Sequence, residues 1–109
     1  MSNEHIVVLI TAPSHDEGEK IATMLVESKL AACVNILPAV HSVYSWQGDI
    51  HTDQEVMLLV KSRAVLFADK LLPAVQEMHP YEVPEIIAVP IAHGLDSYLA
   101  WITAETDGP

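Results

Sequence analysis

The feature that most constrains this fold is a long β-hairpin predicted over residues 33–61. Its two arms are rich in Val, Ile, Leu and aromatic residues, and the turn chemistry of Gln47, Gly48 and Asp49 lies between them. Each arm has about a dozen residues, whereas a usual strand has roughly five or six. We therefore expect part of the hairpin to project beyond the sheet of its own domain. Pro38 lacks a backbone N–H, so the first arm must lie at a sheet edge or contain a bulge.

The rest of the chain alternates predicted strands and helices. A β-branched run over 5–11 predicts a buried strand, and Ser14 with Glu17 forms a capping-box pattern that starts a helix over 14–30. A second amphipathic helix is predicted over 67–78, with Pro73 expected to kink or confine it. Residues 85–91 predict a fourth strand, in which Pro90 indicates an edge or a bulge. Asp96 is the expected N-cap of a short last helix.

This order of elements predicts one fold class. A β-α-β-β-α-β sequence within about a hundred residues is typical of an α+β, ferredoxin-like sandwich, with four antiparallel strands and two helices on one face. No linker or change of composition interrupts the chain, so we expect residues 1–109 to form a single domain with a long hairpin and a short C-terminal helix.

Composition excludes several functional classes. Five Lys and Arg against fifteen Asp and Glu give 5 − 15 = −10, and the cations are scattered, so nucleic acid is not an expected partner. The apolar runs are far shorter than a membrane span needs, so no membrane partner is expected either. A single cysteine, Cys33, cannot form an intrachain disulfide, so the fold must depend on its core. No leading basic and apolar segment resembles a signal peptide, and this favours a cytoplasmic location. Half of the residues are hydrophobic, more than a small monomer readily buries, and this predicts an oligomer.

Catalytic chemistry is not indicated by any motif. Cys33 lies in an apolar run, which favours a buried structural cysteine over a nucleophile. No G-x-S-x-G elbow and no glycine-rich phosphate loop occurs in the sequence. We therefore expect no enzymatic activity.

The segment His79-Pro80-Tyr81-Glu82-Val83-Pro84-Glu85 is the strongest candidate for ligand binding. Its prolines restrict the backbone, so an imidazole and two carboxylates hold fixed positions and could bind a cation. The alternative is a stiff connector in which His79 caps the preceding helix. The large rings of Tyr44, Trp46 and Trp101 form either a binding face or intersubunit anchors, and the apolar excess favours anchors.

Together these motifs resemble the CutA family of divalent-cation tolerance proteins. The resemblance covers about residues 5–104. The matching segments are Thr11-Ala12-Pro13, the run from Leu30 to Ile36, Tyr44-x-Trp46-x-Gly48, Glu55 with Lys61, HPYEVPEI at 79–86 and Tyr98-x-x-Trp101.

The resemblance implies a ferredoxin-like subunit in a tight homotrimer, similar in architecture to the PII signalling proteins. It implies no enzymatic reaction, and it links bacterial members to copper tolerance and eukaryotic members to anchoring of acetylcholinesterase. The expected function is a trimeric, cytoplasmic protein that binds divalent cations, copper among them, in metal tolerance or homeostasis. The expected trimer interface includes Tyr44, Trp46 and Trp101.

The metal ligands implied by the resemblance are matched in part. His79 occupies the histidine position before the Pro-Tyr pair, whereas the cysteine of the first strand is replaced by Ile10 and a neighbouring histidine by Met78. Glu85 and Cys33 are secondary candidates, and Cu(II) or another divalent cation is the expected cofactor. Two other functions stay open: a PII-like signalling or adaptor module that binds a small ligand or a protein at subunit clefts, and a structural assembly without a small ligand.

Overall fold

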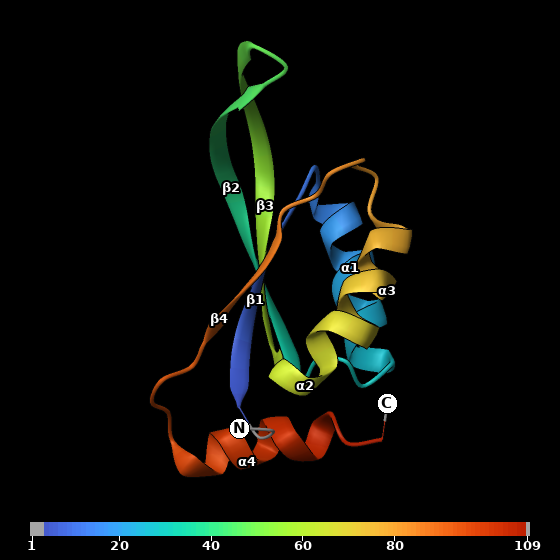
Figure 1. The fold of residues 1–109 in the computed structure, drawn as a ribbon, viewed down its shortest axis with the longest axis vertical. Coiled ribbons are helices and arrows are strands. Elements are labelled where there is room, and N and C mark those ends of the chain that lie inside the picture. The colour runs from blue at the N-terminus through green and yellow to red at the C-terminus, as the bar shows by residue number, and fades with distance from the viewer. Residues whose placement is uncertain (1–3, 109) are drawn as a thin grey trace.

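The chain forms a four-stranded sheet with its two long helical segments on one side (Figure 1). The computed structural model describes residues 4–108. The strand order is β2-β3-β1-β4, and every neighbouring pair is antiparallel, which confirms the predicted α+β, ferredoxin-like fold. The elements in chain order are β1 (His5–Ala12), α1 (His15–Glu27), β2 (Cys33–Trp46), β3 (Asp49–Arg63), α2 (Ala64–Leu66), η1 (Phe67–Leu71), α3 (Leu72–Met78), β4 (Ile86–Pro90) and α4 (Asp96–Glu105).

The β2–β3 hairpin projects far beyond the rest of the sheet, as predicted. Strand β1 ends its pairing with β3 at Ala12 opposite Val56, whereas β2 and β3 continue to pair as far as Trp46 opposite Asp49. The projecting part is therefore a two-stranded ribbon, which stands clear of the helices in Figure 1 and gives the molecule an elongated shape of 44 × 26 × 23 Å. Gln47 and Gly48 close it with φ angles of 50° and 87°, the positive values of a two-residue type I′ turn.

Pro38 lies in a β-bulge, and its strand β2 is an edge strand of the sheet. Both features tolerate a residue without a backbone N–H, so the sheet loses no hydrogen bond at the proline. Leu37 is opposite Met57 and Val40 is opposite Glu55, so two residues of β2 face one residue of β3. The extra residue reverses the alternation of β2 side chains. Residues 33, 35 and 37 share a face with 57, 59 and 61, and beyond the bulge residues 40, 42, 44 and 46 take over that face.

Helix α1 starts as predicted but ends earlier. The Ser14 hydroxyl accepts a hydrogen bond from the Glu17 N–H at 3.2 Å, which caps the first turn. The helix was predicted to reach Leu30, yet it ends at Glu27, because Lys29 takes a left-handed conformation with φ 61°. The Leu30 N–H then donates to the carbonyl of Leu25 at 2.9 Å, the bond of a Schellman cap.

The second helical segment runs from Ala64 to Met78 and changes its winding in the middle. Pro73 has no N–H for the carbonyl of Asp69, four residues before it. The chain forms the wider π-helical turn η1 over Phe67–Leu71 directly before the proline, and Pro73 then lies in the first turn of α3. The prediction that Pro73 disturbs this helix is confirmed, since a π-helical turn precedes the proline.

The C-terminal elements differ slightly from expectation. Strand β4 is an edge strand, as Pro90 requires, and it is shorter than the predicted 85–91. The N-cap of α4 is Leu95 rather than Asp96, which is the first helical residue. No helix among residues 4–108 has the length and apolar character needed to cross a lipid bilayer.

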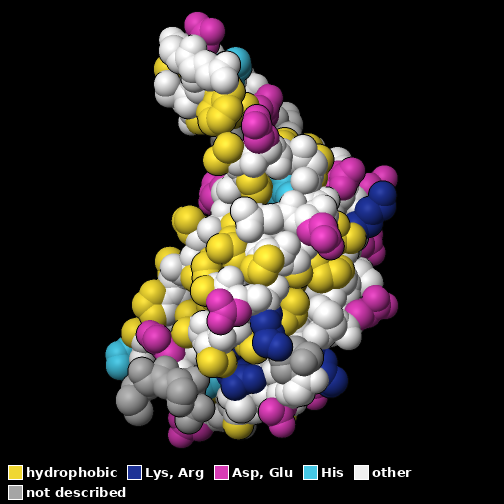
Figure 2. All heavy atoms as spheres, turned by 45° about the vertical axis from the view of Figure 1, so that its right-hand side comes forward, with side chains coloured by type: hydrophobic (Ala, Val, Ile, Leu, Met, Phe, Trp, Pro, Cys, Tyr) yellow, Lys and Arg dark blue, Asp and Glu magenta, His cyan; other side chains and the backbone are white. Residues whose placement is uncertain are grey.

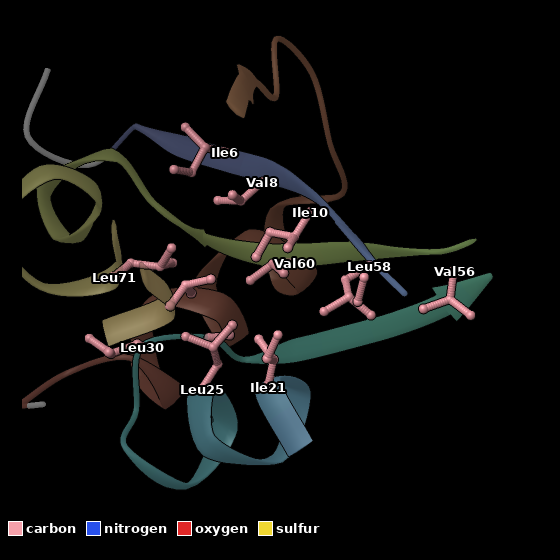
Figure 3. Packing of buried hydrophobic residues seen from close by; sticks show 13 residues of the cluster. Ile6, Val8, Ile10, Ile21, Leu25, Leu30, Val56, Leu58, Val60 and Leu71 are labelled. Carbon is pink, nitrogen blue, oxygen red and sulfur yellow. The ribbon is translucent and has the colours of Figure 1, made fainter. Parts of the chain in front are cut away.

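The core lies between the sheet and the helices (Figure 3). Ile21 and Leu25 of α1 pack on alternate residues of β1 and β3. This close approach leaves little room for a side chain at Gly18, where a Cβ would lie 3.0 Å from a methyl carbon of Val56. The opposite side of the sheet, here called the outer face, meets α4 only at the end where His5 and Arg63 lie. Its remaining apolar side chains are half-buried or exposed, and they are Val7, Leu9, Leu37, Met57, Leu59, Ile87 and Val89.

Replacing Ala39→Gly should stabilise the protein. Ala39 has φ 61°, a left-handed conformation that costs a residue with a Cβ roughly 1–2 kcal/mol, and glycine adopts it freely. After the extra chain entropy of glycine, we expect a gain of about 0.5–1 kcal/mol in urea unfolding at fixed protein concentration. The matched control is Ala100→Gly in the exposed interior of α4, which should lose about 1 kcal/mol. A destabilised Ala39→Gly variant would contradict the prediction.

Candidate functional site

A cleft of about 660 Å³ opens between the projecting hairpin and the loop at residues 79–85. It lies where β1 ends, because the hairpin continues there without a neighbouring strand. This hairpin cleft is lined by Thr11, Ser42, Val43, Tyr44, Trp46, Glu55, Pro80, Tyr81, Glu82, Val83 and Glu85.

His79 fixes the loop to the end of β1. Its side chain is 7% exposed, and Nε2 lies 2.7 Å from the carbonyl oxygen of Thr11. The Tyr81 backbone N–H donates to Nδ1 at 3.1 Å, so the ring proton is on Nε2, which donates to Thr11. His79 is also the C-cap of α3, where its N–H donates to the Val75 carbonyl at 2.8 Å. Both ring nitrogens are therefore engaged within the chain, as in a stiff connector.

Tyr81 connects the loop to the hairpin. Its hydroxyl donates a 2.8 Å hydrogen bond to Oε2 of Glu55, a side chain that is only 9% exposed. Burial, this hydrogen bond and the Glu55 charge together raise the pKa of Tyr81. On the hairpin itself the Tyr44 hydroxyl donates to Asp53, and this bond is the main cause that raises the pKa of Tyr44.

The hairpin cleft is acidic. Three of its lining residues are Glu55, Glu82 and Glu85, and no Lys, Arg or His side chain of the described chain lines it. On the face shown in Figure 2, the projecting hairpin likewise carries Asp and Glu side chains but no Lys or Arg. Carboxylates without neighbouring cations create a negative potential in the cleft, and this potential attracts positively charged ligands.

The structure separates the three predicted interface aromatics. Tyr44 and Trp46 line the hairpin cleft and are about two-fifths exposed, at 41% and 43%. Tyr44 also stacks on His51 of the opposite strand, with ring centroids 5.6 Å apart. Trp101 belongs to α4 at the other end of the molecule (Figure 1), where its ring centroid lies 5.5 Å from that of Tyr98. Their role in a trimer interface stays a prediction.

The three predicted metal ligands lie in different places. His79 is buried behind the loop and Glu85 lines the hairpin cleft. Cys33, in contrast, begins β2 at the α4 end of the sheet, where burial and this thiol raise the pKa of Tyr98.

Strand register shows how far Cys33 is from His79. Cys33 pairs with Lys61, whereas Thr11, the residue bonded to His79, pairs with Met57. Four residues along a strand span about 13 Å, so Cys33 and His79 cannot share one ion within a subunit. Across residues 4–108, no three His, Cys, Asp or Glu side chains form a group that could hold a metal. A role as ligand stays a prediction for each residue separately.

Glu55 and Asp53 were not predicted as site residues. Both lie on β3, where the pattern indicated only a strand; Glu55 lines the cleft, and Asp53 is bonded to the cleft residue Tyr44. The bulge in β2 brings Tyr44 and Trp46 to the same face as these two carboxylates. The available signal was an acidic residue, Glu55, directly before the buried alternation of Val56, Leu58 and Val60.

Residues 6–105 match the model of the CutA1 divalent ion tolerance protein family. The chain belongs to this family. The predicted resemblance is therefore confirmed. The chain is also similar to a protein from Thermus thermophilus named divalent-cation tolerance protein CutA. The two are 52% identical over 92% of this chain and 96% of the relative's length. The chain covers only 55% of a chloroplastic CutA protein of Arabidopsis thaliana, to which it is 46% identical over 93% of its own residues.

Solved CutA1 structures have the same fold. The T. thermophilus structure superposes with a TM-score of 0.91 at 50% identity, over 94% of this chain and 98% of that one. CutA1 from Oryza sativa superposes with a TM-score of 0.92 at 42% identity, over 97% of this chain and 96% of that one. The chain is thus similar over nearly its whole length to members from both bacteria and plants.

The raised pKa of Tyr81 predicts a loss of stability in alkali. The folded state keeps the phenol proton to a higher pH than the unfolded state, whose pKa is near 10.0. The resulting stability is fully present below pH 10 and is lost as the pH rises above it. In urea unfolding across this range, Tyr81→Phe should lose stability less steeply than the wild type. Equal slopes for the two proteins would contradict the prediction.

Proposed function

We propose that this chain is one subunit of a homotrimer that binds divalent cations, copper among them, in metal tolerance, and that it works in the cytoplasm without catalysing a reaction. The observation that carries the proposal is the match to the CutA1 divalent ion tolerance family over residues 6–105. The acidic hairpin cleft supports cation binding, because no Lys, Arg or His among residues 4–108 lines it beside its carboxylates. The single cysteine, which has no partner for a disulfide, supports the cytoplasmic location.

The outer face of the sheet supports the trimer. Leu37, Ile87 and Val89 are 41–50% exposed there, next to the half-buried side chains of β1 and β3. A contiguous apolar sheet face of this kind is typical of a protein–protein contact. Burial between subunits would also account for a chain in which half of the residues are hydrophobic.

The side chains of the loop at 79–85 are of the chemical type that binds a divalent cation, but they are too few to form a complete site within residues 4–108. Imidazole and carboxylate are common ligands of Cu(II) and other divalent ions. His79 can offer Nδ1 only if the Tyr81 N–H turns away from it, and Glu82 and Glu85 lie nearby on the same loop. Since no three-ligand group exists among residues 4–108, we place the remaining ligands on a second subunit or on solvent. Cys33 is then a separate, weaker thiol site.

Calorimetric titration with Cu(II) tests this site. We expect His79→Gln to weaken binding at least tenfold, because the amide can still donate to Thr11 and keep the loop in place but cannot replace imidazole as a ligand. Glu85→Gln should weaken binding, and Cys33→Ala should leave the principal site unchanged.

Three subunits would carry a charge near −30, so diffuse cation binding needs a control. Glu105→Gln removes one charge from α4, outside the cleft, and should not change the Cu(II) affinity. If His79→Gln, Glu85→Gln and Glu105→Gln all bind like the wild type, the ions are attracted by the overall charge and the specific site does not exist.

Sedimentation equilibrium tests the trimer. We expect a trimeric mass at micromolar concentration, and Trp46→Ala should weaken assembly by about 2–4 kcal/mol if the ring is an interface anchor. Ile50→Ala, at a 74% exposed position near the hairpin tip, is the matched control and should assemble normally. A stable monomer of the wild type would refute the trimer, and an unaffected Trp46→Ala would remove Trp46 from the interface.

A second candidate function is favoured by the size of the cleft. A volume of about 660 Å³ is within the range of small-molecule sites, and it supports a PII-like signalling or adaptor module. A thermal-shift screen of metabolites and metals separates the two functions, since a true ligand raises the Tm by mass action. A structural assembly without a small ligand is the outcome if nothing raises it.

A further inference from the structure

We infer that, in the proposed homotrimer, the Lys61 ammonium of one subunit pairs with the Glu55 carboxylate of the next. The inference rests on the trimer of the proposed function and names two side chains that join its subunits. It is independent of copper, because neither His79 nor Glu85 takes part.

Glu55 has one neutral partner within its own subunit. Its side chain is only 9% exposed, and Oε2 accepts the hydrogen bond from the Tyr81 hydroxyl at 2.8 Å. This bond satisfies one oxygen but leaves the charge uncompensated, since no Lys, Arg or His of residues 4–108 forms an ion pair with Glu55. A second subunit that covers the hairpin cleft removes the remaining water from this carboxylate. A buried carboxylate without a cation is strongly unfavourable, so assembly favours a neighbour that supplies one.

Lys61 is an unpaired cation on the same side of β3, the side of the outer face. Its side chain is half-buried, and its ammonium donates to the neutral side chain of Asn35. Within residues 4–108 it forms no ion pair with a carboxylate. The neighbouring cation on this side, Arg63, already donates to the side chain and the carbonyl of Thr106 in α4. Lys61 is therefore the cation that a carboxylate of another subunit can use.

The two charges cannot meet within one subunit. Glu55 and Lys61 are six residues apart on β3, and six residues of a strand span about 20 Å. The outer face thus has a carboxylate at the ribbon end, an ammonium at the α4 end, and half-buried or exposed apolar side chains between them (Figure 1).

A closed ring of three subunits uses such a face well. Each subunit of the ring contacts its two neighbours through different patches, because the contact is heterologous. A face with opposite charges at its two ends can therefore bring the negative end of one subunit to the positive end of the next. The apolar side chains between the charges are buried in the same contact.

The chemistry of lysine suits this contact. Its flexible four-carbon stem packs along apolar side chains while the ammonium reaches a carboxylate. Glu55 lines the hairpin cleft, so it can be reached from the side where Tyr44 and Trp46 are predicted to meet a neighbour. A charge-assisted hydrogen bond that is shielded from water there would also fix how the subunits are aligned.

A double-mutant cycle tests the inference, with assembly measured by sedimentation equilibrium over a range of protein concentrations. Lys61→Met keeps the apolar stem without the charge, and Glu55→Gln keeps an acceptor for Tyr81 without the charge. Each single variant leaves one buried charge unpaired, so its trimer should half-dissociate at a concentration about tenfold or more above that of the wild type. The double variant has neither charge and should assemble better than either single variant.

Two controls accompany the cycle. Lys61→Arg keeps the charge and should retain assembly, and Lys70→Met removes an exposed charge from η1 and should leave assembly unchanged. If Lys61→Met does not fold, as judged by circular dichroism, Lys61→Gln takes its place in the cycle.

The inference is overturned if either single variant assembles like the wild type, or if the two losses simply add in the double variant. Additive losses would mean that the two side chains act separately. A wild-type chain that stays monomeric refutes the trimer and the pairing together, whereas a normal wild-type trimer with additive losses refutes the pairing alone.

Discussion

The bulge at Pro38 and Ala39 is the constraint on which the rest of the site depends. It places two residues of β2 opposite one residue of β3 and so exchanges the faces of β2 between the sheet and the projecting ribbon. As a result Tyr44 and Trp46 share a face with Asp53 and Glu55. With regular pairing they would lie on the opposite side of the ribbon, away from these carboxylates.

The loop at 79–85 completes the cleft because two of its residues, His79 and Tyr81, bind other segments of the chain. His79 is bonded to the end of β1 through Thr11, and Tyr81 reaches across to Glu55 on the hairpin. Both contacts involve buried or half-buried polar groups, for which loss of a partner is costly. The proposed binding functions therefore rest on a surface whose position is set by hydrogen bonds between three distant segments.

Much of the fold was predictable because the signals were local. The capping residue Ser14, the turn at Gln47 and Gly48, and the prolines 38, 73 and 90 each restrict the backbone at their own position, and the structure agrees at all of them. The predicted end of α1 was wrong, because Leu30 continues the apolar pattern while Lys29 already leaves the helix. The prediction of Asp96 as the N-cap of α4 was wrong by one residue. An aspartate is favoured both at the N-cap and in the first turn of a helix, so the sequence pattern does not distinguish the two positions.

The sequence by itself determined the order of strands and helices, the overlong hairpin, the surplus of apolar residues and the family. These follow from periodicity, backbone restriction and composition, which are properties of neighbouring residues. Only the tertiary structure decided that Glu55 is buried against Tyr81, that both nitrogens of His79 are engaged, and that Cys33 lies about 13 Å along the sheet from the His79 contact. The physical reason is that these relations depend on strand register and on contacts between segments far apart in the chain, which no local pattern specifies.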